Sequence, residues 1–306
     1  MERTIDFSLA HKKLFGILHL PENDQPIHTF VLMIVGGAQT RIGSHRMYVQ
    51  LARFLCRNGL PVMRFDYEGL GDSEGDFVGF EYAGPSIRAA VDTLYLSFSS
   101  LQRVVIWALC DGATAAILYA PSDSERICSL VVANPFLESE TAKAQTILKN
   151  YYIRRLMQAD FWRKVLTFQF SIKESASSLS TTLRTSAVNA EEEDWLHTGK
   201  SLSQWVLEGV NSFAKSMHVL ISTDDIQGML FYNLIRKDPA CRKSIKAGRI
   251  KIWLIKGGDH TFTDPQIKDK ACKKSLAAIV ESAPGNGEQG DLCQMRIAAK
   301  TSLITG

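Results

Sequence analysis

Two short stretches of the sequence carry a side chain that could act as a nucleophile at a turn. The stretch GDSEG has the G-x-S-x-G spacing of a nucleophile elbow, with Ser73 at its centre. The stretch VVIWALCDGATAA carries Cys110 directly after an apolar run. Either side chain could attack a carbonyl carbon once a base takes its proton, and would then hold an acyl group covalently.

The surroundings of the two residues favour Cys110. An elbow needs a buried strand that ends at the nucleophile and a helix that begins immediately after it. Ser73 is separated from the apolar run PVMRF by a loop with two glycines, and no helix-forming segment follows it. Cys110 follows the apolar run 104–109, and Gly112 and the helix-forming ATAAILYA come next. We therefore predict Cys110 as the nucleophile and Ser73 as a turn residue, the alternative being that Cys110 is a buried structural cysteine.

A histidine and an acid are expected on loops that follow later strands, in the chain order nucleophile, acid, histidine. His260 lies in KGGDHTF, after the last apolar run, and is the predicted base. The segment HVLISTDD ends in two aspartates. Asp225 is the preferred acid and Asp224 the alternative, since one of the two could cap the helix that follows.

Backbone N–H groups near Cys110 could stabilise an oxyanion. The loop VGGAQTRIGSHR predicts Ala38 as one donor, with Gly37 as the alternative, and the N–H of Asp111 is the second. The carboxylate of Asp111 is a complication, because a negative charge beside the sulfur disfavours both the thiolate and an oxyanion unless it points away.

The charge pattern excludes some functions. Lys and Arg number 35 against 32 Asp and Glu, a net charge of +3, and no basic patch of the kind that binds nucleic acid is present. Three basic residues in the loop after residue 35 could receive an anionic group or be solvated surface charges: Arg41, His45 and Arg46.

The apolar pattern predicts an α/β fold with a mostly parallel sheet covered by helices on both faces. Predicted strands are 30–35, 61–65, 104–109, 130–133, 218–223 and 250–255, and predicted helices are 45–58, 85–97, 112–119 and 265–282. The segments TIDFSLA and LFGILHL predict an antiparallel pair at one sheet edge.

The pattern changes in two regions. Residues 137–215 are helical in character and predict an inserted lid, which divides the core into 1–136 and 216–283. Residues 284–306 are Gly-rich and predict a peripheral or disordered tail.

Other features bear on location and cofactors. We find no secretory signal and no apolar run near the roughly 20 residues that span a bilayer. The six cysteines lack zinc-ligand spacing, so we expect a reducing, cytoplasmic setting and no metal or organic cofactor.

The motifs GILHLP, VVGGAQTRIGSHR, RFDYEGLGDSEG, WALCDGATAAILYAP, VVANPF and GGDHTF, in this order, resemble the α/β-hydrolase superfamily. More narrowly, the chain from about residue 3 to 280 is similar to the type 1 hydrolases associated with the exosortase A system of bacterial exopolysaccharide loci. The resemblance implies a cysteine nucleophile at Cys110, with the acid at Asp225 and the histidine at His260. Two motifs depart from that pattern: ST precedes Asp224 where relatives have GR, and Glu68 stands where many carry arginine.

These residues together predict a hydrolase that cleaves an ester or thioester through a Cys-His-Asp triad. Its substrate would be a small or carrier-linked acyl compound. Two alternatives remain: an acyltransferase that uses the same cysteine, and a non-catalytic binding or scaffold protein with a degenerate site.

Overall fold

The computed structural model describes residues 1–22, 25–37, 39–77, 79–137 and 199–282. The chain divides into two units, Met1–Phe136 with Ser203–Gly306, and Leu137–Leu202. Most of the second unit lies outside the described residues, and so does the segment 284–306. The predicted lid and tail therefore stay predictions, and everything below concerns the first unit.

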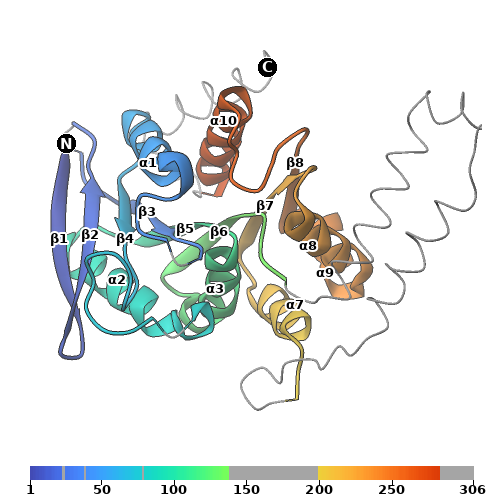
Figure 1. Ribbon diagram of the computed structural model, residues 1–306, viewed down its shortest axis with the longest axis horizontal. Helices are drawn as coiled ribbons and strands as arrows, with labels where there is room; N and C mark the ends of the chain where they lie inside the picture. The colour runs from blue at the N-terminus through green and yellow to red at the C-terminus, as the bar shows by residue number, and fades with distance from the viewer. Residues whose placement is uncertain (23–24, 38, 78, 138–198, 283–306) are drawn as a thin grey trace, which may run out of the picture. The chain divides into compact units, whose positions relative to one another are not determined.

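The described part of this unit contains one eight-stranded sheet in the order β1-β2-β4-β3-β5-β6-β7-β8 (Figure 1). β2 pairs antiparallel with β1 and β4, and every pair from β4 to β8 is parallel. The predicted parallel sheet and its antiparallel edge pair are thus confirmed. The strands are β1 Glu2–Leu9, β2 Lys12–His19, β3 Thr29–Ile34, β4 Val62–Phe65, β5 Arg103–Leu109, β6 Ile127–Ala133, β7 Ser216–Ser222 and β8 Ile250–Ile255.

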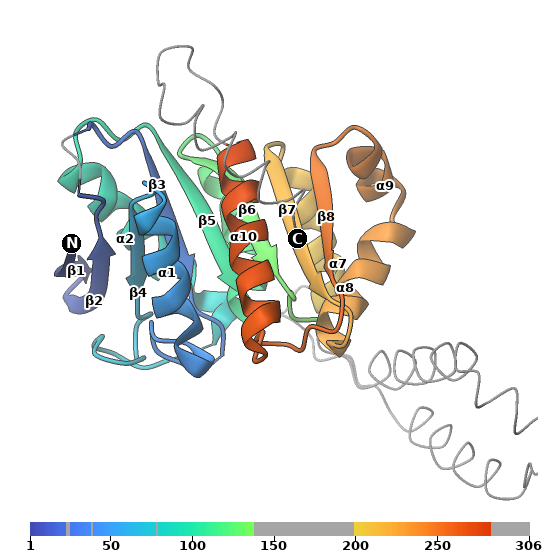
Figure 2. The same cartoon turned by 90° about the horizontal axis from the view of Figure 1, so that it is seen from above.

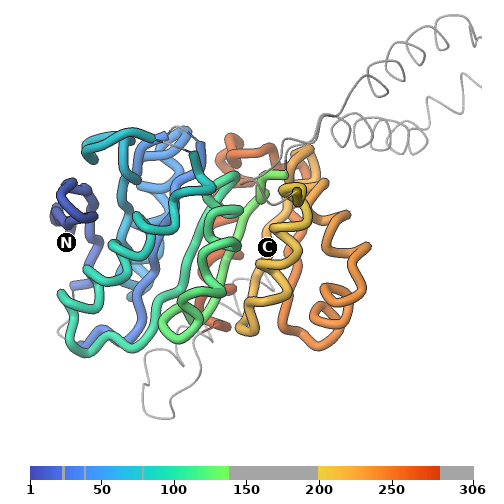
Figure 3. Tube along the Cα trace, turned by 90° about the horizontal axis from the view of Figure 1, so that it is seen from below, coloured from blue at the N-terminus to red at the C-terminus, as the bar shows by residue number. Residues whose placement is uncertain are grey.

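Helices cover both faces of the sheet. α1 and α10 lie on one face (Figure 2), and α2, α3 and α7 lie side by side on the other (Figure 3). α8 contacts β7, and α9 contacts α8 and β8. The helices are α1 Met47–Arg57, α2 Gly84–Ser97, α3 Asp111–Tyr119, α7 Leu202–Ser212, α8 Ile226–Lys237, α9 Pro239–Lys246 and α10 Pro265–Ser282, with short 3₁₀ turns at Ser44–Arg46, Phe80–Tyr82 and Ala120–Asp123. None of the helices in the described ranges is long and apolar enough to cross a membrane.

Trp107 occupies the centre of the face under α1 and α10. Its ring meets the ring of Tyr48 edge-on at 5.4 Å, and its Nε1 donates a hydrogen bond to Ser275 Oγ on α10 at 3.0 Å. A fully buried indole with its N–H satisfied packs large apolar area without a polar penalty. This face therefore holds β5, the strand that leads to Cys110, in a fixed position.

The predicted strand 130–133 is three residues shorter than the real one. The run 130–133 was expected, but β6 begins at Ile127 because Cys128 and Ser129 continue the strand although they interrupt the apolar pattern. The buried Ser129 hydroxyl donates to the carbonyl of Ser216 on the neighbouring strand at 3.0 Å. A polar side chain is tolerated inside the sheet when it is hydrogen-bonded in this way.

We predict that Gly112→Ala destabilises the fold by about 1–3 kcal/mol, the usual cost of overpacking. A Cβ at Gly112 would lie 2.3 Å from the carbonyl oxygen of Val35, so α3 would have to move away from β3. The measurement is urea unfolding followed by circular dichroism.

The matched control is Gly84→Ala at the start of α2, where the nearest atom to a new Cβ is Tyr119 Cδ2 at 3.9 Å. We expect this control to keep or raise the free energy of unfolding, because the helix entropy cost of glycine is removed. Equal stability of the two variants would contradict the close crossing of α3 and β3.

Candidate active site

The predicted site residues come from loops that follow neighbouring parallel strands. Gly37 follows β3, Cys110 follows β5, Asp225 follows β7 and His260 follows β8. Because these strands run in the same direction, all four loops emerge at their carboxyl ends, which is where α/β sheets bind ligands.

Cys110 lies on the tight turn between β5 and α3. Its backbone has φ 61° and ψ −135°, a conformation that residues with a side chain rarely adopt. The turn is fixed by hydrogen bonds from Cys110 N–H to the carbonyl of Ala133 at 3.1 Å and from Phe136 N–H to the carbonyl of Cys110 at 3.2 Å. The strained turn therefore has the geometry expected of an elbow.

Asp225 and His260 are in direct contact. His260 Nδ1 lies 2.9 Å from Asp225 Oδ1, and the other carboxylate oxygen of Asp225 accepts the N–H of Gly228 at 2.6 Å. Asp225 is buried and caps α8, whereas the neighbouring Asp224 is exposed. The sequence left open whether Asp224 or Asp225 contacts the histidine and which of them caps the helix. In the structure, Asp225 does both.

His260 also contacts the predicted nucleophile. Burial alone would lower the pKa of His260, but hydrogen bonds to Asp225 and Cys110 and the negative charges of both residues raise it well above its ordinary value. Asp225 is buried, Cys110 and His260 are half-buried, and the imidazole of His260 interacts with both of the other side chains. An imidazole with these neighbours can hold a positive charge next to the sulfur at neutral pH.

The loop after β3 passes directly over the turn. A Cβ at Gly36 would lie 2.3 Å from the carbonyl oxygen of Leu109 and 2.8 Å from Cys110 Cβ, so the close approach requires glycine. The N–H of Gly37 donates a hydrogen bond to the carboxylate of Asp111. Ala38, the other predicted donor, lies outside the described residues.

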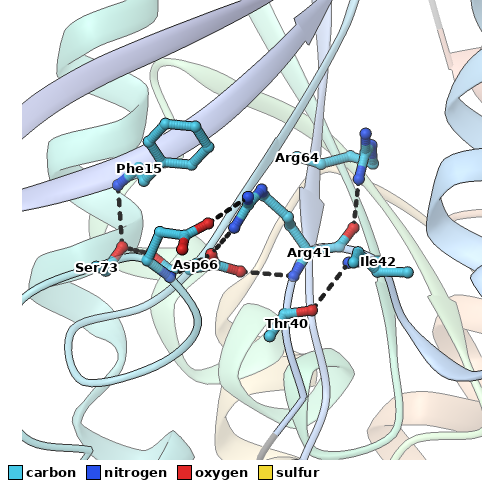
Figure 4. A network of polar contacts seen from close by, with 8 residues as sticks. Phe15, Thr40, Arg41, Ile42, Arg64, Asp66 and Ser73 are labelled. Atoms are coloured by element: carbon cyan, nitrogen blue, oxygen red, sulfur yellow. Dashed lines mark hydrogen bonds and ion pairs between the residues drawn. The ribbon is translucent and has the colours of Figure 1, made fainter.

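The side chain of Arg41 forms ion pairs with other residues of the protein (Figure 4). The guanidinium of Arg41 forms ion pairs with the fully buried Asp66 and with Asp72. Its backbone N–H donates a hydrogen bond to the carboxylate of Asp66 at 2.6 Å. Its contacts therefore give no support to an anion-binding role and indicate that it anchors the loop after β3. His45 and Arg46, the other two basic residues predicted there, are exposed.

Ser73 belongs to the same loop support. Its hydroxyl donates to the carbonyl of Asp66 at 2.8 Å and accepts the N–H of Phe15 at 2.9 Å (Figure 4). These hydrogen bonds attach the GDSEG segment to β2, and none of them involves His260. They agree with the interpretation of Ser73 as a turn residue.

Asn134 was missed by the sequence analysis. This fully buried residue follows β6, and its Nδ2 donates to the carbonyl of His260 at 2.9 Å and to Ser222 Oγ at 3.0 Å. Its Oδ1 accepts the N–H of Ser222 at 2.8 Å. The available signal was an amide side chain directly after a buried strand, in VVANPF. Asn134 thereby ties the histidine loop to the end of β7.

The arrangement brings the thiol of Cys110, the imidazole of His260 and the carboxylate of Asp225 together at one end of the sheet. Among the residues that the structure describes, no group of three or more His, Cys, Asp or Glu side chains could hold a metal ion.

Comparison with known proteins gives the same picture of the fold. An esterase of Pyrococcus furiosus is 15% identical and superposes with a TM-score of 0.59, over 92% of this chain and 91% of that chain. Est1E of Butyrivibrio proteoclasticus, solved with ferulic acid, is 16% identical with a TM-score of 0.57, over 90% of this chain and 99% of that one. At these identities the likeness shows the α/β-hydrolase fold.

One curated protein matches a shorter segment. The lysophosphatidylserine lipase ABHD12 of Danio rerio is 41% identical over 81 residues, which are 26% of this chain and 19% of that lipase. The matched segment thus spans about a fifth of that relative.

A family model, described as serine aminopeptidase, S33, matches residues 28–282, from just before β3 to the end of α10. Since this match covers most of the sheet and every loop that contributes to the site, the chain belongs to the S33 serine aminopeptidase family of α/β-hydrolases.

Proposed function

We propose that this α/β-hydrolase cleaves an ester or thioester through an acyl intermediate on Cys110. The observation that carries the proposal is the chain of contacts from Asp225 through His260 to Cys110, with Cys110 on a strained strand–helix turn. A buried cysteine with a purely structural role needs neither the strain nor the histidine.

The mechanism follows from these contacts. His260 takes the proton of the Cys110 thiol, and the sulfur attacks the acyl carbonyl carbon. Backbone N–H groups of Gly37 and Asp111 stabilise the oxyanion. His260 then gives its proton to the leaving alcohol or thiol as that bond breaks. Water, deprotonated by His260, attacks the acyl-cysteine, and the free acid leaves with the thiol restored.

The family name refers to serine, and this chain carries cysteine at the elbow. The raised pKa of His260 suits cysteine better than serine, because an imidazolium stabilises a thiolate, whereas serine needs a neutral imidazole as its base. The electrostatics of the site therefore support the cysteine chemistry.

The substrate setting rests on resemblance. Similarity to the exosortase A system-associated hydrolases favours an acyl group linked to a carrier or to an exopolysaccharide, and a cytoplasmic location. The similarity to esterases and to a lipase segment favours an oxygen ester among the possible bonds.

We predict that a thiol-directed acyl probe labels Cys110 selectively. Burial raises the pKa of Cys56, Cys128, Cys241 and Cys272, so these thiols stay protonated. Peptide mapping by mass spectrometry should find the adduct on Cys110, and none on these four described cysteines either in the native protein or in Cys110→Ala. Labelling spread evenly over the cysteines would favour the scaffold alternative.

We predict that Asp225→Asn lowers the rate of Cys110 acylation at pH 7 by about 10²–10⁴-fold. The asparagine oxygen still caps α8, but its missing charge no longer raises the pKa of His260. In the native protein the imidazolium persists above its ordinary pKa of about 6.5 and is lost only as the pH passes the raised value. In the variant the imidazolium is lost at lower pH, so at pH 7 less positive charge remains beside the sulfur of Cys110.

The pH dependence of the acylation rate tests whether the missing charge of Asp225 causes the loss. Above about pH 8.5, the ordinary pKa of a free thiol, the thiolate forms without help and the gap between the two proteins should narrow. Asp238→Asn is the matched control, because Asp238 caps α9 in the same way without contacting a histidine. A rate ratio that stays constant from pH 6 to 9.5 would contradict the proposed ion pair.

Acyl transfer is the second candidate, since an acyl-cysteine can pass its acyl group to an alcohol. With an excess of a sugar or carrier alcohol, hydrolysis predicts that free acid remains the main product. Product analysis by chromatography distinguishes the two, and an acylated alcohol as main product would establish transfer.

A further inference from the structure

The carboxylate of Asp111 accepts hydrogen bonds from the backbone N–H groups that the proposed mechanism assigns to the oxyanion. Asp111 is the first residue of α3 and follows Cys110 directly. Its Oδ1 accepts the N–H of Gly37, and the N–H groups of Gly112 and of Asp111 itself also hydrogen-bond to the carboxylate. Gly37 and Asp111 supply the two described N–H groups that the proposed mechanism assigns to the oxyanion.

Competition follows from the chemistry of these donors. A backbone N–H carries one proton, so the N–H of Gly37 cannot serve the carboxylate and an acyl oxygen at full strength together. The carboxylate lies against the loop and the nucleophile, because a Cβ at Gly36 would be 2.7 Å from Asp111 Oδ1 and 2.8 Å from Cys110 Cβ. An acyl carbonyl that approaches the sulfur therefore finds the N–H of Gly37 already hydrogen-bonded to the Asp111 carboxyl group.

Burial and the polar neighbours of the Asp111 carboxyl group act on its pKa in opposite directions. Burial raises the pKa of Asp111, whereas the three backbone hydrogen bonds and the charge of His260 oppose that rise. The titratable groups that face it are Cys110, His260, Tyr48 and Tyr67, and a negative charge on Asp111 raises the pKa of both tyrosines. Among these neighbours, His260 alone is a cation.

We propose that Asp111 is an internal competitor, whose carboxylate closes the oxyanion site of the resting protein and must be displaced before Cys110 can be acylated. The proposal rests on the proposed function and adds a specificity-determining residue to it. A small ester that binds only through its carbonyl cannot displace the carboxylate well. A substrate held by a larger carrier portion gains binding elsewhere that offsets the displacement, so the site discriminates against small esters.

The test compares two reagents on the full chain, Asp111→Ala and Asp111→Asn. Phenyl thioacetate acylates the sulfur through an oxyanion, whereas iodoacetamide alkylates it without one. From the usual contribution of a hydrogen bond to a charged group, we expect Asp111→Ala to raise the acylation rate constant by about 10–100-fold. In the same variant, the alkylation rate constant should change by less than about threefold. The acylation rate constant of Asp111→Asn, whose acceptor is uncharged, should lie between those of the native protein and Asp111→Ala. Intact-mass kinetics give both rates, and peptide mapping confirms Cys110 as the site.

Two results would overturn the proposal. Equal increases with both reagents would mean that Asp111 acts only through its charge beside the sulfur. An acylation rate that is unchanged or lower in Asp111→Ala would mean that the carboxylate does not compete with the carbonyl.

A second measurement is independent of acylation. The amide proton of Gly37 should resonate downfield in the native protein, move upfield in Asp111→Ala and exchange faster with solvent. An unchanged Gly37 resonance rejects the competitor while leaving the proposed function standing. A shifted resonance with no acylation in any variant rejects the proposed function, and the competitor role of Asp111 with it.

Discussion

The turn at Cys110 is the constraint on which the other features of the site depend. A side chain at φ 61° is unfavourable by roughly 1–3 kcal/mol and persists only where the surroundings determine it fully. Here the surroundings are the neighbouring strands β3 and β6, the glycines that allow the loop and helix to approach, and the backbone hydrogen bonds on both sides of the sulfur. The turn places the half-buried Cys110 at the end of β5 and begins α3 at the very next residue, Asp111.

The histidine side of the site is held differently. His260 itself has no positive φ, although Phe262 two residues later has φ 55°. Side-chain hydrogen bonds hold His260, with Asp225 on the ring and Asn134 on the backbone carbonyl. Asn134 also binds Ser222 at the end of β7, so the loops after β6, β7 and β8 share one buried amide. A group that must take up and return a proton benefits from such a fixed position, because proton transfer requires hydrogen-bond distance.

Local sequence patterns are sufficient to predict much of the fold and part of the candidate site. Apolar runs identified the six parallel strands, and the run that ends at Cys110 located the elbow, because both depend on a few consecutive residues. The contacts of Asp225, Asn134 and Arg41 depend on which loops meet in space. Asp224 and Asp225 are adjacent in sequence, and only the direction of each side chain in the turn decides which one reaches the histidine.

The support of the loop after β3 extends to the edge of the sheet. The buried Arg64 of β4 donates to the carbonyl of Arg41 at 2.6 Å and to His19 of β2 at 2.9 Å. Burial, followed by the charge of Arg64, lowers the pKa of His19 to about 4, so its neutral ring can accept this bond. The region that matches the family begins at residue 28 and leaves out this histidine. A fragment trimmed to that region would lose the buried partner of Arg64, so the packed structure of this protein extends beyond the region that matches the family.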